Sequence, residues 1–241
     1  IYRPQDGSFK FQQGPLFHNL VLADEINRAP AKVQSALLEA MAERQITVGS
    51  KTYSLPALFL VMATQNPIEQ EGTYPLPEAQ LDRFLMHVRI DYPDAEAEQQ
   101  ILQINRDEAR QQPGQSVGPP MRLTQHDLFS ARDQVFDVFL AEPLEQYLIQ
   151  LVLATRNPQA YGQQMQGWLE YGASPRASIA LDRCARVMAW LDGRDYVTPD
   201  DIQDIAFDVL RHRIILSYEA EAEGISTDHF INELIQQVAV P

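Results

Sequence analysis

A short apolar run that ends in two acids decides the fold, and it reads Leu20-Val21-Leu22-Ala23-Asp24-Glu25. Four apolar residues in a row are typical of a strand that is buried in a parallel sheet. Pro30 then begins a helix that continues to about Glu43, with its apolar residues on one face. Two acids at the carboxyl end of such a strand lie in the crevice where open α/β sheets bind ligands.

Two further runs extend this strand-helix pattern. Residues 58–64 predict a second buried strand, which ends before Asn66, and residues 84–90 predict a third. Strands that alternate with helices in this way favour a parallel, doubly wound sheet of the α/β class. Residues 45–55 contain two alternating runs around Gly49-Ser50, which indicates a β-hairpin inserted into that pattern.

The second part of the chain has a different composition, because helical periodicity dominates after Tyr92-Pro93. We expect helices at about 94–110, 124–135, 142–156, 176–192, 199–210 and 227–238. The sequence therefore predicts two domains: residues 1–92 as part of an α/β core and residues 93–241 as an all-α domain.

Composition and charge narrow the class of protein. The 241 residues include 19 Lys and Arg against 33 Asp and Glu, a net charge of −14, which argues against broad nucleic-acid binding. No apolar run approaches the roughly 20 residues of a membrane-spanning helix. The start, Ile1 to Asp6, lacks the layout of a signal peptide, and the single Cys184 cannot form an internal disulfide. These features favour a cytoplasmic protein, and the missing initiator Met indicates a piece of a longer chain.

Polar side chains follow two of the predicted strands. Asp24 and Glu25 come after the first strand, and Asn66 comes after the second. In phosphoryl transfer, a first acid at this place holds Mg²⁺ and a second activates the attacking water, while a nearby amide can meet a terminal phosphate. Solvated acids and an ordinary Asn-Pro turn would explain each feature alone. Two polar tips on strands that flank one helix favour the phosphate site.

Four segments resemble motifs of the MoxR-type AAA+ ATPases. Leu20–Pro30 resembles the Walker B segment, Ala63–Glu69 the sensor 1 strand end, Glu71–Phe84 the arginine-finger segment, and Gly172–Ala177 sensor 2 at the start of a lid helix. The hairpin at 45–55 is similar to the pre-sensor 1 hairpin of the same branch. The motifs occur in the right order, so the resemblance implies a partial AAA+ core followed by a helical lid.

The resemblance also implies ATP and Mg²⁺ as cofactors and a role for each motif residue. Asp24 would serve Mg²⁺, Glu25 would activate water, and Asn66 would sense the γ-phosphate. Arg83 would reach the neighbouring subunit's site, where such an arginine contributes roughly 10³–10⁵ in rate. Arg176 would bind phosphate from the lid. Without the family frame, a surface ion pair for Arg83 and a solvated first-turn residue for Arg176 would be the preferred interpretations.

One family motif is missing from the sequence. A P-loop, Gly-x-x-x-x-Gly-Lys-Ser/Thr, would precede the strand before Asp24, yet Gly7 and Gly14 do not fit the spacing and Lys10 is not followed by Ser or Thr. Since this loop supplies the phosphate cradle, the chain as written should bind nucleotide poorly and hydrolyse none. We interpret it as the carboxyl-terminal portion of a longer ATPase, with a naturally degenerate relative as the alternative.

The resemblance implies a chaperone-like motor that remodels or matures protein complexes. Its partners would be other copies in a hexameric ring and von Willebrand factor A-domain proteins or other protein substrates, with no membrane and no nucleic acid. One alternative is a non-hydrolysing interaction module that binds partners through the hairpin or lid. A second is a chelatase-type or helicase-type subunit with the same Asp24, Glu25 and Asn66, of which acidity disfavours the helicase.

The remaining reactive side chains favour structural roles. Cys184 lies at helical spacing with apolar residues, which indicates a core position. Arg211-His212-Arg213 is a small basic island, which we interpret as an exposed helix end; packing near the nucleotide or a neighbouring subunit is the alternative. Trp168 lies in a stretch that fits a mobile lid loop or a partner contact. The histidines show no paired metal-ligand spacing: His18, His87, His126, His212 and His229.

Overall fold

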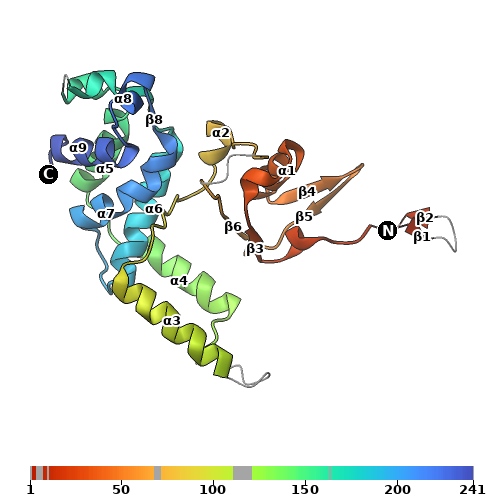
Figure 1. Ribbon diagram of the computed structural model, residues 1–241. Coiled ribbons are helices and arrows are strands. Elements are labelled where there is room, and N and C mark those ends of the chain that lie inside the picture. The colour runs from red at the N-terminus through yellow and green to blue at the C-terminus, as the bar shows by residue number, and fades with distance from the viewer. Residues whose placement is uncertain are drawn as a thin grey trace.

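The apolar run that ends at Ala23 forms a strand that pairs with the next apolar run. The computed structural model describes residues 2–3, 8–9, 11–67, 72–110, 121–162 and 164–240. In it, β3 (Leu20–Ala23) lies parallel to β6 (Leu60–Ala63), in the register Leu20 to Leu60 and Ala23 to Ala63. The predicted parallel arrangement is confirmed, and both strands end at one edge (Figure 1).

One face of this strand pair is covered and the other is open. α1 (Ala31–Glu43) buries Leu37 and Leu38 in a small hydrophobic cluster with Ile26 and Leu76. The side chains on the opposite face are more than half exposed: Leu20, Leu22, Leu60 and Met62. The expectation of fully buried strands is therefore wrong, because α1 packs on one face only.

The predicted hairpin is present. β4 (Gln45–Val48) and β5 (Lys51–Ser54) pair antiparallel around Gly49, whose φ of +63° is a conformation that glycine adopts without steric cost. At the base of the hairpin, the ring of Tyr53 stacks on Phe11 with 4.7 Å between ring centroids. This aromatic contact joins the hairpin to the segment that precedes β3.

The predicted third strand, residues 84–90, does not form. The segment lies against the helical part of the molecule instead, where the His87 N–H donates to the Asp208 carbonyl at 2.8 Å. Ile90 is 90% exposed. A strand is stabilised by pairing with a neighbour, and in the part of the chain that the structure describes no strand pairs with residues 84–90.

The six helices predicted for the second part are all present. They are α3 (Ala95–Arg110), α4 (Gln125–Asp137), α5 (Glu142–Ala154), α6 (Pro175–Leu191), α7 (Pro199–Leu210) and α9 (Thr227–Gln237). Capping residues explain why the first residues of these helices were predicted closely. At α7, for example, the Thr198 N–H donates to Asp201 Oδ2 at 2.7 Å in a capping box.

Short elements complete the fold. The strands are β1 (Tyr2–Arg3), β2 (Ser8–Phe9), β7 (Leu169–Tyr171) and β8 (Ile215–Leu216), and the short α-helices are α2 (Glu78–Leu81) and α8 (Tyr218–Ala222). Single 3-10 turns lie at Pro15–Phe17, Ile26–Arg28, Pro158–Ala160, Gln164–Gly167 and Arg211–Arg213. β7 and β8 pair antiparallel, which adds a small sheet to the domain expected to be all helical.

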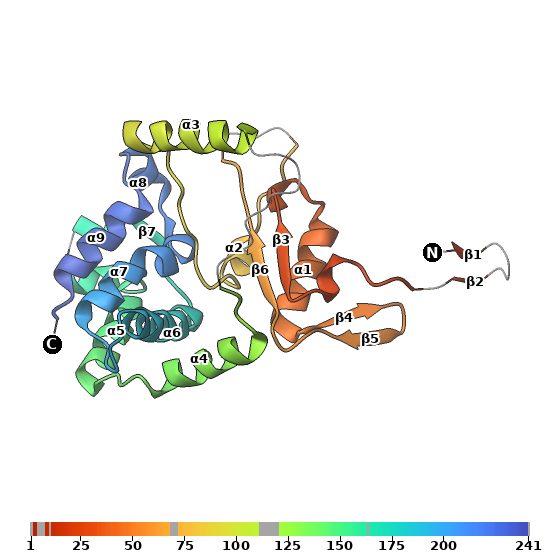
Figure 2. The same ribbon diagram turned by 90° about the horizontal axis from the view of Figure 1, so that it is seen from below.

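The helical part has its own hydrophobic core, built mainly by α5, α6, α7 and α9. Cys184 lies in this core as predicted, and burial raises the pKa of its thiol to about 11. The ring of Trp168 packs against the same core. α3 and α4 bury no side chain, and Figure 2 shows both helices extending from the helical part toward the α/β part.

The two hydrophobic clusters lie in different parts of the sequence. One joins residues between Ile26 and Leu76, and the other joins residues between Val138 and Val238. The domain boundary expected between residues 92 and 93 stays a prediction. Within the described residues, no helix is both long and apolar enough to cross a bilayer.

Candidate functional site

The ends of β3 and β6 are tied together by one hydroxyl group. Thr64, the first residue after β6, donates its Oγ1–H to Asp24 Oδ1 at 2.5 Å and accepts the Glu25 N–H at 2.9 Å. Its backbone also bonds both sides of this turn, to the Ala23 carbonyl at 3.1 Å and from the Ile26 N–H at 2.9 Å. The two acids predicted to serve a phosphate group are therefore held at the common edge of the strands. Sequence reasoning missed Thr64, although its place after β6, in register with Asp24, was readable.

Glu25 has an unusual backbone conformation. Its φ of 49° and ψ of 50° lie in the left-handed region, which costs a residue with a side chain roughly 1–2 kcal/mol. The hydrogen bond from its N–H to Thr64 and an ion pair with Arg28, at 3.2 Å from Nε to Oε2, hold it there. Strained residues that neighbours hold in place cluster at functional sites.

Asn66 comes two residues after Thr64 and is partly buried, so it lies close in the chain to the edge where Asp24 and Glu25 are held. Ile68 and Glu69 of the same motif, and Glu71 of the next, lie outside the described residues. In the described parts of the chain, no three His, Cys, Asp or Glu side chains are grouped to hold a metal ion. The exposed carboxylate of Asp24 nevertheless suits Mg²⁺, which takes one or two protein carboxylates and completes its shell with water and phosphate oxygens.

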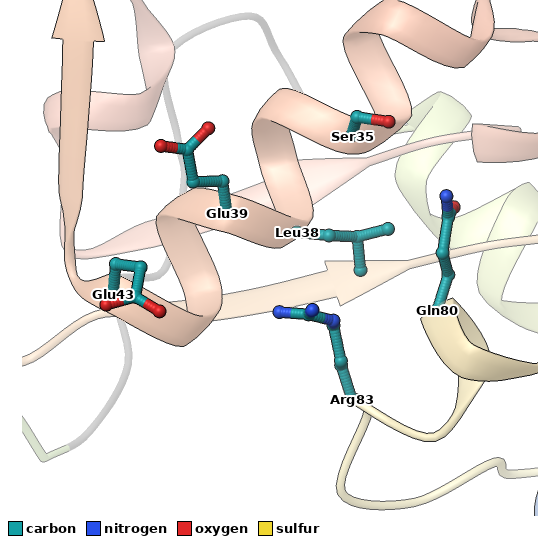
Figure 3. Close-up of a pocket in the computed structure, with 6 residues that line it drawn as sticks. All are labelled: Ser35, Leu38, Glu39, Glu43, Gln80 and Arg83. Carbon is teal, nitrogen blue, oxygen red and sulfur yellow. The ribbon is translucent and has the colours of Figure 1, made fainter.

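Arg83 lies in a pocket along α1. The cavity, of about 230 Å³, is lined by Ser35, Leu38, Glu39, Glu43, Gln80 and Arg83. Figure 3 shows the Arg83 side chain extending toward α1 from the turn after α2. The guanidinium is exposed, and within the described residues it makes no ion pair. The ordinary alternative, a surface ion pair, is therefore not what the structure shows for Arg83.

Arg176 lies with Arg83 and away from Asp24. Both arginines line a second pocket of about 390 Å³, together with Met41, Ala42 and Glu43 at the end of α1. α1 begins shortly after Asp24 and has 13 residues. At a rise of about 1.5 Å per residue, its two ends are roughly 20 Å apart. The structure thus divides the predicted site residues into two groups, with the acids beside the start of α1 and the arginines beside its end.

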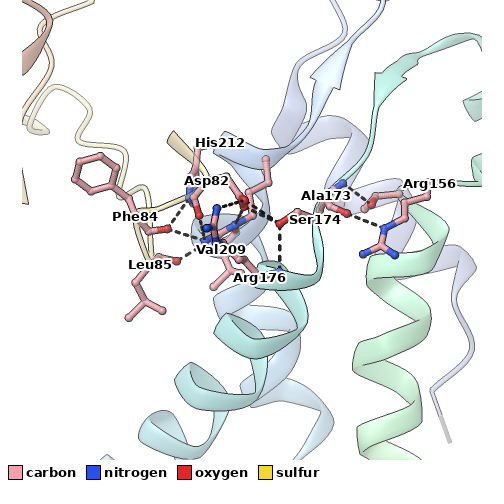
Figure 4. Close-up of polar contacts among 11 residues, drawn as sticks. Asp82, Phe84, Leu85, Arg156, Ala173, Ser174, Arg176, Val209 and His212 are labelled. Carbon is pink, nitrogen blue, oxygen red and sulfur yellow. Dashed lines mark hydrogen bonds and ion pairs between the residues drawn. The ribbon is translucent and has the colours of Figure 1, made fainter. Parts of the chain in front are cut away.

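A carboxylate joins the arginine group to the lid. Asp82 Oδ1 accepts from Arg213 Nε at 2.9 Å, and Oδ2 accepts from Arg176 Nη1 at 3.1 Å and from Ser174 Oγ at 2.9 Å (Figure 4). Burial raises the pKa of Asp82, but the hydrogen bonds from Ser174, Arg213 and Arg176 outweigh burial and hold it below its usual value. Asp82 therefore stays charged and anchors the α6 start beside the turn that carries Arg83.

The basic island at Arg211–Arg213 is not an exposed helix end, so that interpretation is wrong. The Arg213 side chain is 2% exposed, and its Nη2 donates to the carbonyls of Phe84 at 2.6 Å and Asp82 at 3.2 Å. Arg211 Nη1 donates to the His87 carbonyl at 2.7 Å. These arginines hold the segment after Asp82 against the helical lid. Because they donate to backbone carbonyls of that segment, it packs on the lid instead of pairing as a strand.

His212 contacts the same segment. Its Nε2 lies 3.1 Å from the Phe84 carbonyl and donates to it, while the buried Nδ1 has no hydrogen-bond partner among the residues that the structure describes. Burial, with a smaller effect of the Arg213 charge, lowers the pKa of His212 to about 4. The imidazole is therefore neutral near pH 7.

Known proteins resemble this chain over its whole length. Residues 1–86 match the AAA_3 family, described as "ATPase family associated with various cellular activities (AAA)", and residues 166–234 match the AAA lid domain. The chain is 45% identical to Chaperone MoxR1 of Mycobacterium tuberculosis over 100% of this chain and 62% of that protein. It is 32% identical to Protein MoxR of Methylorubrum extorquens, over 100% of this chain and 73% of that protein.

The chain belongs to the MoxR family of AAA+ ATPases. Members of this superfamily are in general nucleotide-dependent and oligomeric, and the predicted family is thus confirmed. A crystal structure of a protein from Cytophaga hutchinsonii that is assigned as an ATPase matches with a TM-score of 0.90 and 48% identity, over 100% of this chain and 72% of that one. The likeness confirms the expected α/β core and lid of the MoxR fold. The MoxR-family chain thus spans between 62% and 73% of the length of these relatives.

Proposed function

We propose that this chain is the carboxyl-terminal portion of a MoxR-type ATPase whose two groups of site residues serve two different nucleotides. One observation supports this most directly: Arg83 and Arg176 share a pocket at the end of α1, whereas Asp24 and Glu25 are held near its start. Within one chain, a side chain cannot cross that length of helix. The arginines would therefore act on a nucleotide held by the next subunit, which requires a ring, and we propose a hexamer.

The acids at the strand ends would carry out the chemistry on the chain's own side. Asp24, oriented by the Thr64 hydroxyl, would hold Mg²⁺ through water. Glu25 would orient the attacking water and accept its proton, a role worth about 10²–10⁴ in rate. Asn66 would contact the terminal phosphate through its amide. ATP and Mg²⁺ supply the phosphoryl group and the charge that these side chains position.

The arginines would act from the neighbouring chain. Arg83 has no competing ion pair within the described residues, so its guanidinium is available to neutralise the charge that develops on a transferred phosphoryl group. Arg176 would bind the same phosphates from the lid. A phosphate cradle is absent from this sequence, so we propose that the 241 residues are inactive alone and that hydrolysis needs a region that precedes Ile1.

The cellular role follows at a coarser level. The relative in M. tuberculosis is a chaperone by name, which supports a motor that remodels or matures protein complexes. We propose that the motor works in the cytoplasm and that von Willebrand factor A-domain proteins or other protein substrates are its partners. In this proposal, residues 1–92 form the core and residues 93–241 the lid.

Mixing two inactive variants tests the proposal. The polypeptide is expressed with the upstream coding region, and ATP hydrolysis is measured for Glu25→Gln, Arg83→Ala and their mixture. Each variant alone should lose activity by about 10²-fold or more. In the mixture, an Arg83 from one variant meets an intact Glu25 of the other, so activity should return.

The matched control is a mixture of Glu25→Gln with the double variant Glu25→Gln/Arg83→Ala, in which no intact interface can form and activity should stay low. No recovery in the first mixture would contradict action between subunits. Full activity of Glu25→Gln alone would contradict the role of Glu25.

A non-hydrolysing module is the second candidate, and the missing P-loop is the observation that favours it. Such a module would keep the AAA+ shape and bind partners through the hairpin or the lid. Absence of ATP hydrolysis by the upstream-extended polypeptide would favour this candidate. A chelatase-type subunit is a third reading, since the magnesium-chelatase subunit ChlI of Nicotiana tabacum is 29% identical over 81% of this chain and 42% of that protein.

A further inference from the structure

Asp82 is a single carboxylate shared by two guanidinium groups. Arg213 occupies Oδ1 and Arg176 occupies Oδ2, while Ser174 Oγ lies 3.0 and 2.9 Å from the two oxygens. Figure 4 shows Ser174 and Arg176, at the start of α6, beside Asp82, and Arg213 lies in the 3-10 turn that follows α7. Both oxygens of the carboxylate are therefore engaged by a guanidinium and lie within hydrogen-bond distance of the Ser174 hydroxyl.

The two arginines hold this carboxylate with very different strength. The Arg213 side chain is 2% exposed, so its charge depends on Asp82 and on the carbonyls around it. The Arg176 side chain is 52% exposed, and water can replace its ion pair with little loss. Breaking the buried contact with Arg213 is therefore costly, whereas the half-exposed contact with Arg176 is weak.

Arg176, which makes the weaker of these two contacts, lines the same pocket as Arg83. Two guanidinium groups beside one pocket repel each other, and the negative charge of Asp82 offsets that repulsion. Asp82 also adjoins Arg83 in the chain, and the Arg213 bond to the Asp82 carbonyl fixes the backbone from which Arg83 projects. The Asp82 side chain thus places Arg176, whereas its backbone carbonyl places Arg83, and only the first contact depends on the Asp82 charge.

We propose that Asp82 is a positioning residue: it holds Arg176 beside Arg83 while the pocket is empty and yields Arg176 to a phosphate group that enters. Throughout this exchange, Arg213 and Ser174 keep Asp82 bound to the lid, so the arrival of an anion changes the Arg176 contact without detaching core from lid. This inference rests on the proposed function, since it assigns the entering anion to the nucleotide of the next subunit.

The kinetic test uses Asp82→Asn, which keeps the shape of the side chain and removes its charge. In the upstream-extended polypeptide, kcat for ATP hydrolysis should fall by about tenfold while KM does not rise. In an Arg176→Ala background the same change should have little further effect, less than about twofold, because the group that Asp82 positions is gone. An equal loss in both backgrounds would overturn the proposal, since a merely structural role would not depend on Arg176.

Loss of the Asp82 charge leaves Arg213 buried without its partner, so a second pair of variants guards against unfolding. Arg213→Met is compared with Asp82→Asn/Arg213→Met, because replacing both members of a buried pair is tolerated better than removing one. The double variant should show the lower kcat by about tenfold, and equal kcat values would overturn the proposal.

A binding measurement on the 241-residue chain separates this inference from the proposed function. Inorganic tripolyphosphate is titrated by calorimetry into the chain and its variants. Since Asp82 competes for Arg176, Asp82→Asn should bind tripolyphosphate about threefold more tightly than the unaltered chain, and Arg176→Ala should remove the gain. Unchanged affinity in Asp82→Asn would overturn the inference whatever the outcome of subunit mixing. Failed mixing with the affinity gain intact would count against the proposed function alone.

Discussion

Asp24 and Asp82 are both carboxylates in short turns, and the structure surrounds them very differently. Asp24 is exposed and accepts one neutral hydroxyl, that of Thr64. Asp82 is 14% exposed at its side chain and accepts two guanidinium groups and a hydroxyl. A carboxylate that accepts one hydrogen bond can still bind a cation. A carboxylate that accepts hydrogen bonds from several side chains holds together the segments that carry those side chains. The contrast teaches that the Asp24 carboxylate keeps acceptor capacity for a cation, whereas the Asp82 carboxylate uses its capacity to attach the turn after α2 to the helical part.

Removal of the buried Arg213 guanidinium should break its contact with Asp82, which we call the lid joint, and this is the largest effect that we expect. Arg213→Ala should lower the free energy of unfolding by about 3–5 kcal/mol, because it leaves Asp82 without its buried partner. Urea denaturation, followed by circular dichroism, measures the loss. Arg176→Ala is the matched control at the same carboxylate and should cost less than about 1 kcal/mol, since its ion pair is half exposed. Equal losses of unfolding free energy for the two variants would show that the burial of each arginine does not determine how much its contact with Asp82 stabilises the fold.

Acid should weaken the same joint through His212. Its pKa is about 4 in the folded chain and about 6.5 when unfolded, so between these values only the unfolded state gains a proton. Stability should therefore fall by about 3 kcal/mol as the pH drops from 6.5 to 4, and this contribution should not change further below pH 4. His212→Gln keeps an N–H donor for the Phe84 carbonyl and does not titrate. Parallel stability curves for the two proteins over this pH range would contradict the assignment.

At the strand-end site the smallest effect is expected, and it has the opposite sign. Glu25→Gly should raise the free energy of unfolding by about 1 kcal/mol, because glycine relieves the left-handed backbone. The same change should abolish ATP hydrolysis in the upstream-extended polypeptide. Arg44→Gly is the control, since Arg44 has a φ of 50° at the end of α1 and no proposed part in chemistry. It should gain similar stability and keep activity, and a loss of stability in Glu25→Gly would contradict strain at this site.

Local signals allowed much of the fold to be predicted. The helices of the lid begin at capping residues such as Thr198 and Ser174, which act within one turn of the chain. The strands β3 and β6 were predictable because each is a short apolar run between polar residues. Residues 84–90 have the same pattern and form no strand, because pairing depends on a neighbour that local sequence does not contain.

Site residues that directly follow a strand could be predicted from the sequence. Ion pairs between residues far apart in the chain could not. Asp24 and Glu25 come directly after an apolar run, so their common edge with Thr64 follows from strand direction. Arg213 and Asp82 are 131 residues apart in the chain, and nothing in a basic island at a helix end indicates burial. Only the packing of the lid on the segment after Asp82 reveals that partner.

The open face of β3 and β6 has a practical consequence for handling the polypeptide. This face is an exposed apolar patch formed by Leu20, Leu22, Leu60 and Met62. Exposed apolar patches promote self-association. Concentrated solutions of the 241-residue chain should bind hydrophobic dyes such as anilinonaphthalene sulfonate and form soluble aggregates at moderate ionic strength. Polar replacements such as Leu22→Gln and Met62→Gln are the natural remedy, because they change the colloidal behaviour of the chain without touching its charged joints.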